Sequence, residues 1–190
     1  MALSKIDVAN MLTGATPVAN GGTAITSGFV NGFAGMANQW RITADFTGAG
    51  NPIASNWELA DTDGYGSLGS NMTQSSGVFT FPATGIYYIQ FVVSNTADNI
   101  DGQLQIQVET TVNGSDFGGA SEQVAGISRA SDSNTYSTSF VFDVTNVSTH
   151  KCRFVVASTS SDTTTHGHSS QNETHATFLK MGDTMVYLDR

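Results

Sequence analysis

Three histidines toward the end of the sequence have the residue type and spacing to bind a metal ion. His166 and His168 are separated by one glycine, and His175 follows after a polar stretch. Alternate residues of an extended strand face the same side, which would bring the first two imidazoles together. Zinc needs three or four ligands at about 2.0–2.3 Å, and the flanking Thr, Ser and Asn residues favour a polar loop. We therefore expect no metal site, with His166, His168 and His175 as the candidate ligands of the alternative interpretation.

Two groups of aspartates have the spacing of a calcium loop. Asp61, Asp63 and Gly64 resemble the start of an EF-hand loop, and Asp98 with Asp101 forms a second acidic pair. The EF-hand pattern also needs a third ligand before its glycine and a glutamate at position twelve, and both are missing. Ordinary turns are the favoured interpretation, and calcium is the alternative.

Signatures of enzymatic chemistry are missing from the sequence. It contains no Gly-x-Ser-x-Gly elbow, no phosphate-binding loop and no His-Glu-x-x-His. Sixteen acidic residues make some pair of neighbouring carboxylates expected by chance. Cys152, between Lys151 and Arg153, falls in a predicted strand, where a thiol is more often inert packing than a nucleophile. We expect no catalytic residue and no enzymatic activity.

Three aromatic residues have the chemistry to stack on sugar rings. Tyr65, Trp57 and Tyr136 lie in stretches rich in Ser, Thr and Asn, whose side chains could hydrogen-bond a glycan. Aromatic side chains also dominate protein cores, and a core position is the alternative for Trp57.

Composition and charge exclude several classes of partner. The net charge of −9 leaves no basic stripe to neutralise phosphates, which argues against a nucleic acid. No segment approaches the ~20 apolar residues that span a bilayer, and we expect no membrane association. The first residues lack the apolar region of a signal peptide, so we expect synthesis in a cytoplasm. A single cysteine excludes an intrachain disulfide.

The elements that would position these residues are β-strands. Charged residues are only 12% of the chain, and the spacing of alternating apolar runs predicts about eight to ten strands in a sandwich or barrel from residue 38 to 190. Residues 1–37 lack sustained periodicity and are predicted to form an extended arm that docks on a neighbouring protein. The residues of this arm that we expect to make the contact are Ile6, Val8, Leu12, Pro17 and Val18.

One predicted strand is apolar on both faces. From Ile86 to Val93, one face carries Tyr87, Ile89 and Phe91, while the other also carries mainly apolar side chains. A sheet with one wet face shows clean alternation, so this strand is predicted to be covered on both sides. One cover would be the core, and the other a partner subunit.

The segment from Ser76 to Ile89 resembles a known family. It is similar to the Gly-x-Phe-Thr-x-Pro-x-x-Gly-x-Tyr core of the complement globular-head (C-one-q-like) domain, within the tumour-necrosis-factor-like jelly rolls. The matching positions are Gly77, Phe79, Thr80, Pro82, Gly85 and Tyr87. The resemblance implies a ten-strand jelly roll and a tight homotrimer. On that basis the expected interface residues are Phe79, Phe81, Tyr87, Ile89, Phe91 and Phe178.

The arm carries a second resemblance. The segment from Pro17 to Thr23 is similar to the Val-Ala-Asn-Gly-Gly-Thr stretch of bacteriophage tail-fibre and other virion proteins. With a complement-like head, this implies a virion structural protein, either a capsid decoration (cement) protein or an appendage. The alternatives are a tail-fibre tip that binds a host receptor or surface glycan, and a free lectin-like trimer. Collagen-like Gly-x-y repeats are absent, which speaks against an animal complement relative.

Overall fold

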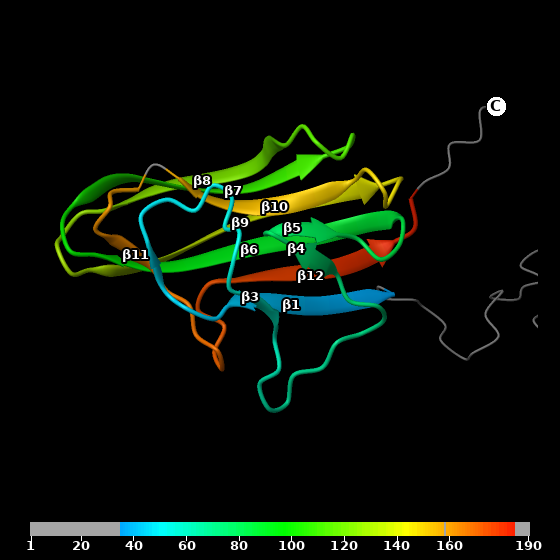
Figure 1. Cartoon of the computed structure of the whole chain (residues 1–190), viewed down its shortest axis with the longest axis horizontal. Helices are drawn as coiled ribbons and strands as arrows, with labels where there is room; N and C mark the ends of the chain where they lie inside the picture. The colour runs from blue at the N-terminus through cyan, green and yellow to red at the C-terminus, as the bar shows by residue number, and fades with distance from the viewer. Residues whose placement is uncertain (1–34, 158, 185–190) are drawn as a thin grey trace, which may run out of the picture. The chain divides into compact units, whose positions relative to one another are not determined.

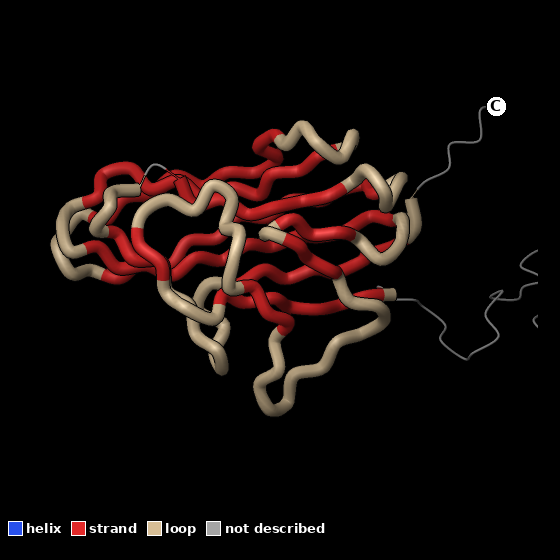
Figure 2. Tube along the Cα trace, in the orientation of Figure 1, coloured by secondary structure: helices blue, strands red, loops and turns tan. Residues whose placement is uncertain are grey.

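The computed structural model of the chain describes residues 35–157 and 159–184, whose regular structure is entirely β-strand (Figure 2). The first strand begins at Met36, two residues before the predicted boundary at residue 38. The expected docking residues lie outside the described part of the chain: Ile6, Val8, Leu12, Pro17 and Val18. Their role stays a prediction.

In the described part of the chain, twelve strands form two antiparallel sheets, which confirms the predicted all-β sandwich (Figure 1). The seven-stranded sheet has the order β2-β11-β6-β12-β1-β3, and β9 pairs with the other edge of β6. It contains β1 (Met36–Ile42), β2 (Phe46–Thr47), β3 (Trp57–Leu59), β6 (Gly85–Ala97), β9 (Ser133–Val144), β11 (Thr163–Thr165) and β12 (His175–Gly182). The five-stranded sheet has the order β4-β5-β10-β7-β8 and contains β4 (Thr73–Ser75), β5 (Val78–Thr80), β7 (Asp101–Thr111), β8 (Gly118–Ile127) and β10 (Lys151–Ala157).

The core lies between the two sheets and is centred on aromatic rings. The centroid of the Phe79 ring lies 5.2 Å from that of Trp57, 5.4 Å from that of Phe154 and 5.3 Å from that of Phe178. Strand β6 alternates strictly, so every second side chain from Gly85 to Ala97 is buried. Burying this apolar surface is the main favourable contribution to folding.

The core corrects the predicted subunit interface. Every side chain expected there is at most 2% exposed within the single chain: Phe79, Phe81, Tyr87, Ile89, Phe91 and Phe178. A side chain that is already enclosed by its own two sheets has no surface to offer a second subunit. The motif that carried the resemblance is therefore a core motif, and these six residues are not available for an interface with a second subunit.

The turn between β4 and β5 shows why this motif needs its glycine. Gly77 has a φ of +77°, and a Cβ at this position would lie 2.1 Å from the backbone oxygen of Ile53. Its N–H donates to the Oε1 of Gln74. Only glycine combines the left-handed backbone with this close approach.

Two loops project from the sandwich beside β1 and β3. Residues 60–72 connect β3 to β4, and residues 166–174 connect β11 to β12. Figure 1 shows both loops projecting from the same side of the sandwich.

Candidate functional site

The three candidate metal-binding histidines do not come together. The ring of His166 lies against Asp45, while the Nδ1 of His168 accepts hydrogen bonds from the backbone N–H and the hydroxyl of Ser170. His175 lies on β12, where burial lowers the pKa of its imidazole against the opposing effect of backbone hydrogen bonds with Glu173 and Asn172. Within the described residues, the group of side chains close enough to share a metal ion includes His166 but neither of the other two histidines.

The two candidate calcium loops make other contacts. Asp61 forms an ion pair with Arg41, and Asp63 is exposed. The Oδ2 of Asp101 accepts hydrogen bonds from the backbone N–H of Ser160 at 2.9 Å and from the hydroxyl of Thr163 at 2.6 Å. Asp101 therefore ties the loop after β10 to β7, as a turn-forming residue would.

The candidate nucleophile and two of the three candidate sugar-stacking aromatics are in or against the core. Cys152 is fully buried, and this burial raises the pKa of its thiol. Trp57 is also buried and donates from Nε1 to the backbone oxygen of Ile53 at 2.9 Å. Tyr136 packs against the core with its hydroxyl enclosed. Tyr65, the third candidate, lines a surface hollow.

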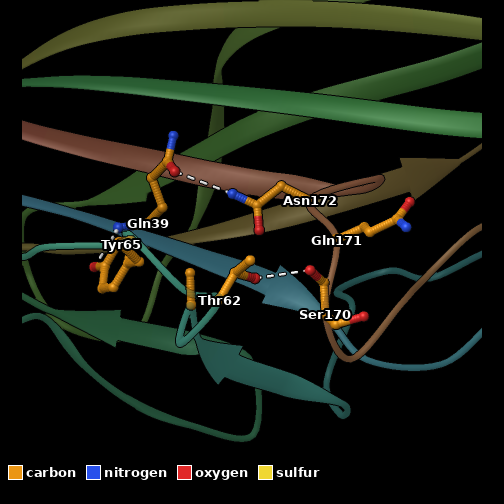
Figure 3. Close-up of a pocket in the computed structure, with 7 residues that line it drawn as sticks. Gln39, Thr62, Tyr65, Ser170, Gln171 and Asn172 are labelled. Atoms are coloured by element: carbon orange, nitrogen blue, oxygen red, sulfur yellow. Dashed lines mark hydrogen bonds between the residues drawn. The ribbon is translucent and has the colours of Figure 1, made fainter.

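Tyr65 stands between two adjoining hollows on the surface of the seven-stranded sheet. The first encloses about 440 Å³ and is lined by Gln39, Ala60, Thr62, Tyr65, Ser170, Gln171 and Asn172. The second encloses about 360 Å³ and adds Ala37, Asn38, Gly64, Gly66, Thr177 and Leu179 to the shared Gln39 and Tyr65. Because they share these two residues, we name the two hollows together the Tyr65 groove. Figure 3 shows the first hollow.

Gln39 on β1 is the centre of the hydrogen bonds in the Tyr65 groove. Its side-chain Nε2 donates to the hydroxyl of Thr177 at 3.0 Å, and its Oε1 accepts from the Nδ2 of Asn172 at 3.0 Å. Its backbone N–H donates to the hydroxyl of Tyr65 at 3.2 Å. Figure 3 shows Gln39 flanked by Tyr65 from one loop and Asn172 from the other. These bonds hold the amides and the aromatic ring in place before any ligand arrives.

A buried arginine fastens the two loops that wall the groove. The Nε of Arg41 donates to Glu58 at 2.7 Å, and its Nη1 donates to the hydroxyl of Thr62 at 2.7 Å. Its Nη2 donates to Asp61 and to the backbone oxygen of Ser169. Burial by itself would lower the pKa of this guanidinium, but the hydrogen bonds and charges of Glu58 and Asp61 outweigh it and raise the pKa. Arg41 therefore stays charged and holds both loops against β1 and β3.

A direct hydrogen bond also joins the two loops. The hydroxyl of Thr62 donates to the backbone oxygen of Ser170 at 2.7 Å. Arg41, Thr62 and Gln39 could not be predicted from the sequence, because each is a polar residue in a strand or a loop, where solvent exposure is the ordinary expectation. No local sequence signal distinguishes them, because their partners come from distant segments.

The lining of the groove limits what it can bind. Among the described residues that line it, none is charged, and the polar groups are amides and hydroxyls beside one aromatic ring. Such a surface offers hydrogen-bond donors and acceptors to a neutral polar ligand and a flat ring face to its apolar side.

An apolar row on the outer face of the same sheet adjoins the Tyr65 groove and shares Ala37 and Leu179 with it. Val141 on β9 pairs with Tyr88 on β6, Tyr88 with Leu179 on β12, and Leu179 with Ala37 on β1. Val141 is 52% exposed, although it is a large apolar side chain. The row accounts for the second apolar face predicted for residues 86–93 and lies on the opposite side of β6 from the core.

The comparisons with known proteins show the fold. No protein-family model and no curated protein matches the sequence. Among solved structures, murine APRIL at pH 5.0 is 13% identical with a TM-score of 0.54, covering 76% of this chain and 98% of that chain. Eiger TNF from S. frugiperda is also 13% identical, with a TM-score of 0.56, covering 83% of this chain and 99% of that chain. The described part of the chain therefore has the jelly-roll fold of the TNF-like domains, as the resemblance in the sequence implied.

Proposed function

We propose that this chain is a non-enzymatic structural protein of a bacteriophage virion. In this proposal the jelly roll is the head of a homotrimer, and the residues that precede β1 form the arm that docks on the particle. The TNF-like fold supports the head, and the Val-Ala-Asn-Gly-Gly-Thr segment of the arm supports the virion. The head projects outward as a capsid decoration protein or a small appendage.

The apolar row on the outer face of the seven-stranded sheet carries the trimer part of this proposal. Tyr88, Leu179 and Val141 lie side by side across three strands, with Ile86 also on the outer face of β6. Contiguous apolar surface on a folded domain favours association, because burying it removes it from water. The Tyr88 side chain occupies the middle of the row, where an interface excludes water best.

A pair of matched substitutions tests the trimer. Val141→Asp places a charge in the apolar row, whereas Val124→Asp changes a valine that is 45% exposed on β8 of the other sheet. Native mass spectrometry at micromolar concentration should show a trimer for the unmodified chain and Val124→Asp, and mainly monomer for Val141→Asp. If the unmodified chain is a monomer at this concentration, the result would contradict the proposed homotrimer.

Immunogold labelling of purified virions tests the location. Label over the whole capsid supports the decoration role, and label confined to the tail or one vertex supports an appendage. Particles without label would contradict the virion assignment and favour a free lectin-like trimer.

The Tyr65 groove favours a second candidate function, the binding of a host surface glycan. Its uncharged lining of amides, hydroxyls and one aromatic ring matches the alternating polar and apolar faces of a neutral saccharide. Thr62 and Asn172 come from different loops and contribute a hydroxyl and an amide to the wall of the first hollow (Figure 3).

A glycan array with two variants of one residue tests this binding. Tyr65→Ala removes the ring, and Tyr65→Phe keeps the ring but removes the hydroxyl that accepts from the Gln39 N–H. Binding through stacking should be lost in Tyr65→Ala and largely retained in Tyr65→Phe. An array on which the unmodified chain binds nothing, or on which Tyr65→Ala binds equally well, would contradict the glycan role.

A further inference from the structure

We propose that Asp45, His166 and Glu173 form a binding site for a divalent transition-metal ion of the zinc class. The three side chains each offer one ligand atom, and these atoms all lie within 4.8 Å of one another. The Oδ2 of Asp45 is 3.3 Å from the Nδ1 of His166. The site does not depend on the proposed virion function.

Backbone pairing brings Asp45 and His166 together, although they are 121 residues apart in the sequence. Strand β11 pairs with β2 so that Thr165 lies opposite Phe46, and the antiparallel register places His166 next to Asp45. The backbone N–H of Gly167 donates to the Oδ1 of Asp45 at 2.8 Å. This bond fixes one carboxylate oxygen and leaves Oδ2 directed at the imidazole.

The glycine between the two histidines is required for this approach. A Cβ at Gly167 would lie 2.6 Å from the backbone oxygen and 2.7 Å from the backbone nitrogen of Ala44. Since backbone atoms cannot move aside as a side chain can, a larger residue would push the segment of His166 away from Asp45. The glycine of the His-Gly-His sequence is therefore explained by close packing of two backbones.

His166 and Glu173 are anchored on the same residue of the central strand. The backbone N–H of His166 donates to the oxygen of Ser94 at 2.8 Å, and the backbone N–H of Ser94 donates to the hydroxyl of Thr174 at 3.2 Å. Thr174, which follows Glu173, is fully buried, and its backbone oxygen accepts from the N–H of Ile42 at 2.9 Å. Both ligand-bearing segments are thus held on β6 before a metal arrives, as a preorganised site requires.

The second nitrogen of His166 has the partner that a metal-binding histidine needs. Its Nε2 is 2.8 Å from the hydroxyl oxygen of Thr96, which is in turn 2.8 Å from the hydroxyl of Ser133. When the proton is on Nε2, it is donated to Thr96 and the Nδ1 lone pair faces the Asp45 carboxylate. Such outer partners set the tautomer and orientation of metal-binding histidines. A cation between Nδ1 and the carboxylates would make this arrangement favourable.

The charge of the cluster also favours a cation, beside the pairing of the Asp45 carboxylate with the His166 imidazole. Asp45 and Glu173 place two carboxylates near one imidazole, and neither forms an ion pair with a lysine or arginine within the described residues. Two like charges this close repel each other unless a positive charge lies between them. Imidazole ligands favour zinc and related transition metals over calcium and magnesium. Asp45 is 53% exposed, which leaves room for water to complete the coordination.

A bound metal would fasten the loop that forms one wall of the Tyr65 groove. Residues 166–174 contain two of the ligands at their ends and, between them, Ser170, Gln171 and Asn172 of the groove lining. Joining Asp45 to both ends of this loop reduces the conformations that it can adopt. The metal is therefore expected to stabilise the loop as well as the fold.

Isothermal titration of the metal-free full-length chain with Zn²⁺ tests the site. The unmodified chain should bind one ion per chain with micromolar affinity, and Zn²⁺ should raise its melting temperature. Asp45→Asn, His166→Gln and Glu173→Gln should each weaken binding by about tenfold or more, and Thr96→Val should weaken it by a similar factor through the outer hydrogen bond. Asp63→Asn and His168→Gln, which change an exposed acid and a histidine outside the cluster, are the matched controls and should bind as the unmodified chain does.

Two further readouts separate loss of ligands from loss of fold. Circular dichroism should show the same β spectrum for every variant, and Co²⁺ bound in place of Zn²⁺ should give a visible absorption band that changes when His166 is replaced. The site is refuted by three results: no binding of Zn²⁺ to the unmodified chain, equal loss in the two control variants, or displacement of Zn²⁺ by equimolar Ca²⁺.

Discussion

Replacing Arg41 should destabilise the fold and loosen the groove together. The Arg41 side chain is completely buried and donates to Glu58, Asp61, Thr62 and a backbone oxygen in the loop of residues 166–174. Removing one partner of a buried ion pair costs about 3–5 kcal/mol when the other charge stays buried. Here Glu58 and Asp61 are 35% and 76% exposed, so water can solvate them after Arg41→Ala. The loss in the free energy of unfolding is therefore expected near the value of one or two charged hydrogen bonds, about 2–3 kcal/mol.

Urea unfolding at a fixed protein concentration measures this loss, because assembly would otherwise change the apparent stability. Arg129→Ala is the matched control, since Arg129 is exposed and should change the free energy of unfolding by less than about 0.5 kcal/mol. Hydrogen exchange should also quicken in residues 61–66 and 169–172 of Arg41→Ala, while the core strands stay protected. A loss no larger than that of Arg129→Ala would refute the role of Arg41 as the tie between the two loops.

Three more predictions concern the core and a half-buried histidine, His175. Phe79→Ala should lower the free energy of unfolding by about 3–5 kcal/mol, because the ring is fully buried among other rings. Urea unfolding measures this loss, and a value below about 1 kcal/mol would contradict the core position of Phe79. The Cys152 thiol should not react with a thiol reagent until the chain unfolds, because burial encloses it and raises its pKa; rapid reaction of the folded chain would show that the strand opens. Burial lowers the pKa of His175 in the folded chain, so the unfolded chain takes up a proton first as the pH falls through about 6.5. Stability should therefore decline below that pH, and His175→Gln should decline less; parallel pH curves would contradict this origin.

Much of the fold follows from local pattern. Alternation of apolar residues and turn signals predicted the all-β sandwich, and the strand predicted around Cys152 is present as β10 (Lys151–Ala157). The two apolar faces of residues 86–93 also correspond to real surfaces, a core face and an outer row. Side-chain direction in a strand has a period of two, so these properties are readable from a short stretch of sequence.

The direction of each face and the composition of each site depended on the tertiary structure. Periodicity shows that Tyr87 and Tyr88 point to opposite sides, but only the packing of the second sheet decides that Tyr87 is in the core. The sequence by itself singled out Tyr65 and His166, because tyrosine and histidine carry recognisable chemistry at any position. Their partners Gln39 and Asp45 carried no such signal. Pairing of β1 with both β3 and β12 places Gln39 between the two loops of the groove, and pairing of β2 with β11 places Asp45 beside His166. The registers with β12 and β11 join segments more than a hundred residues apart in the sequence, so they are decided by the whole sandwich.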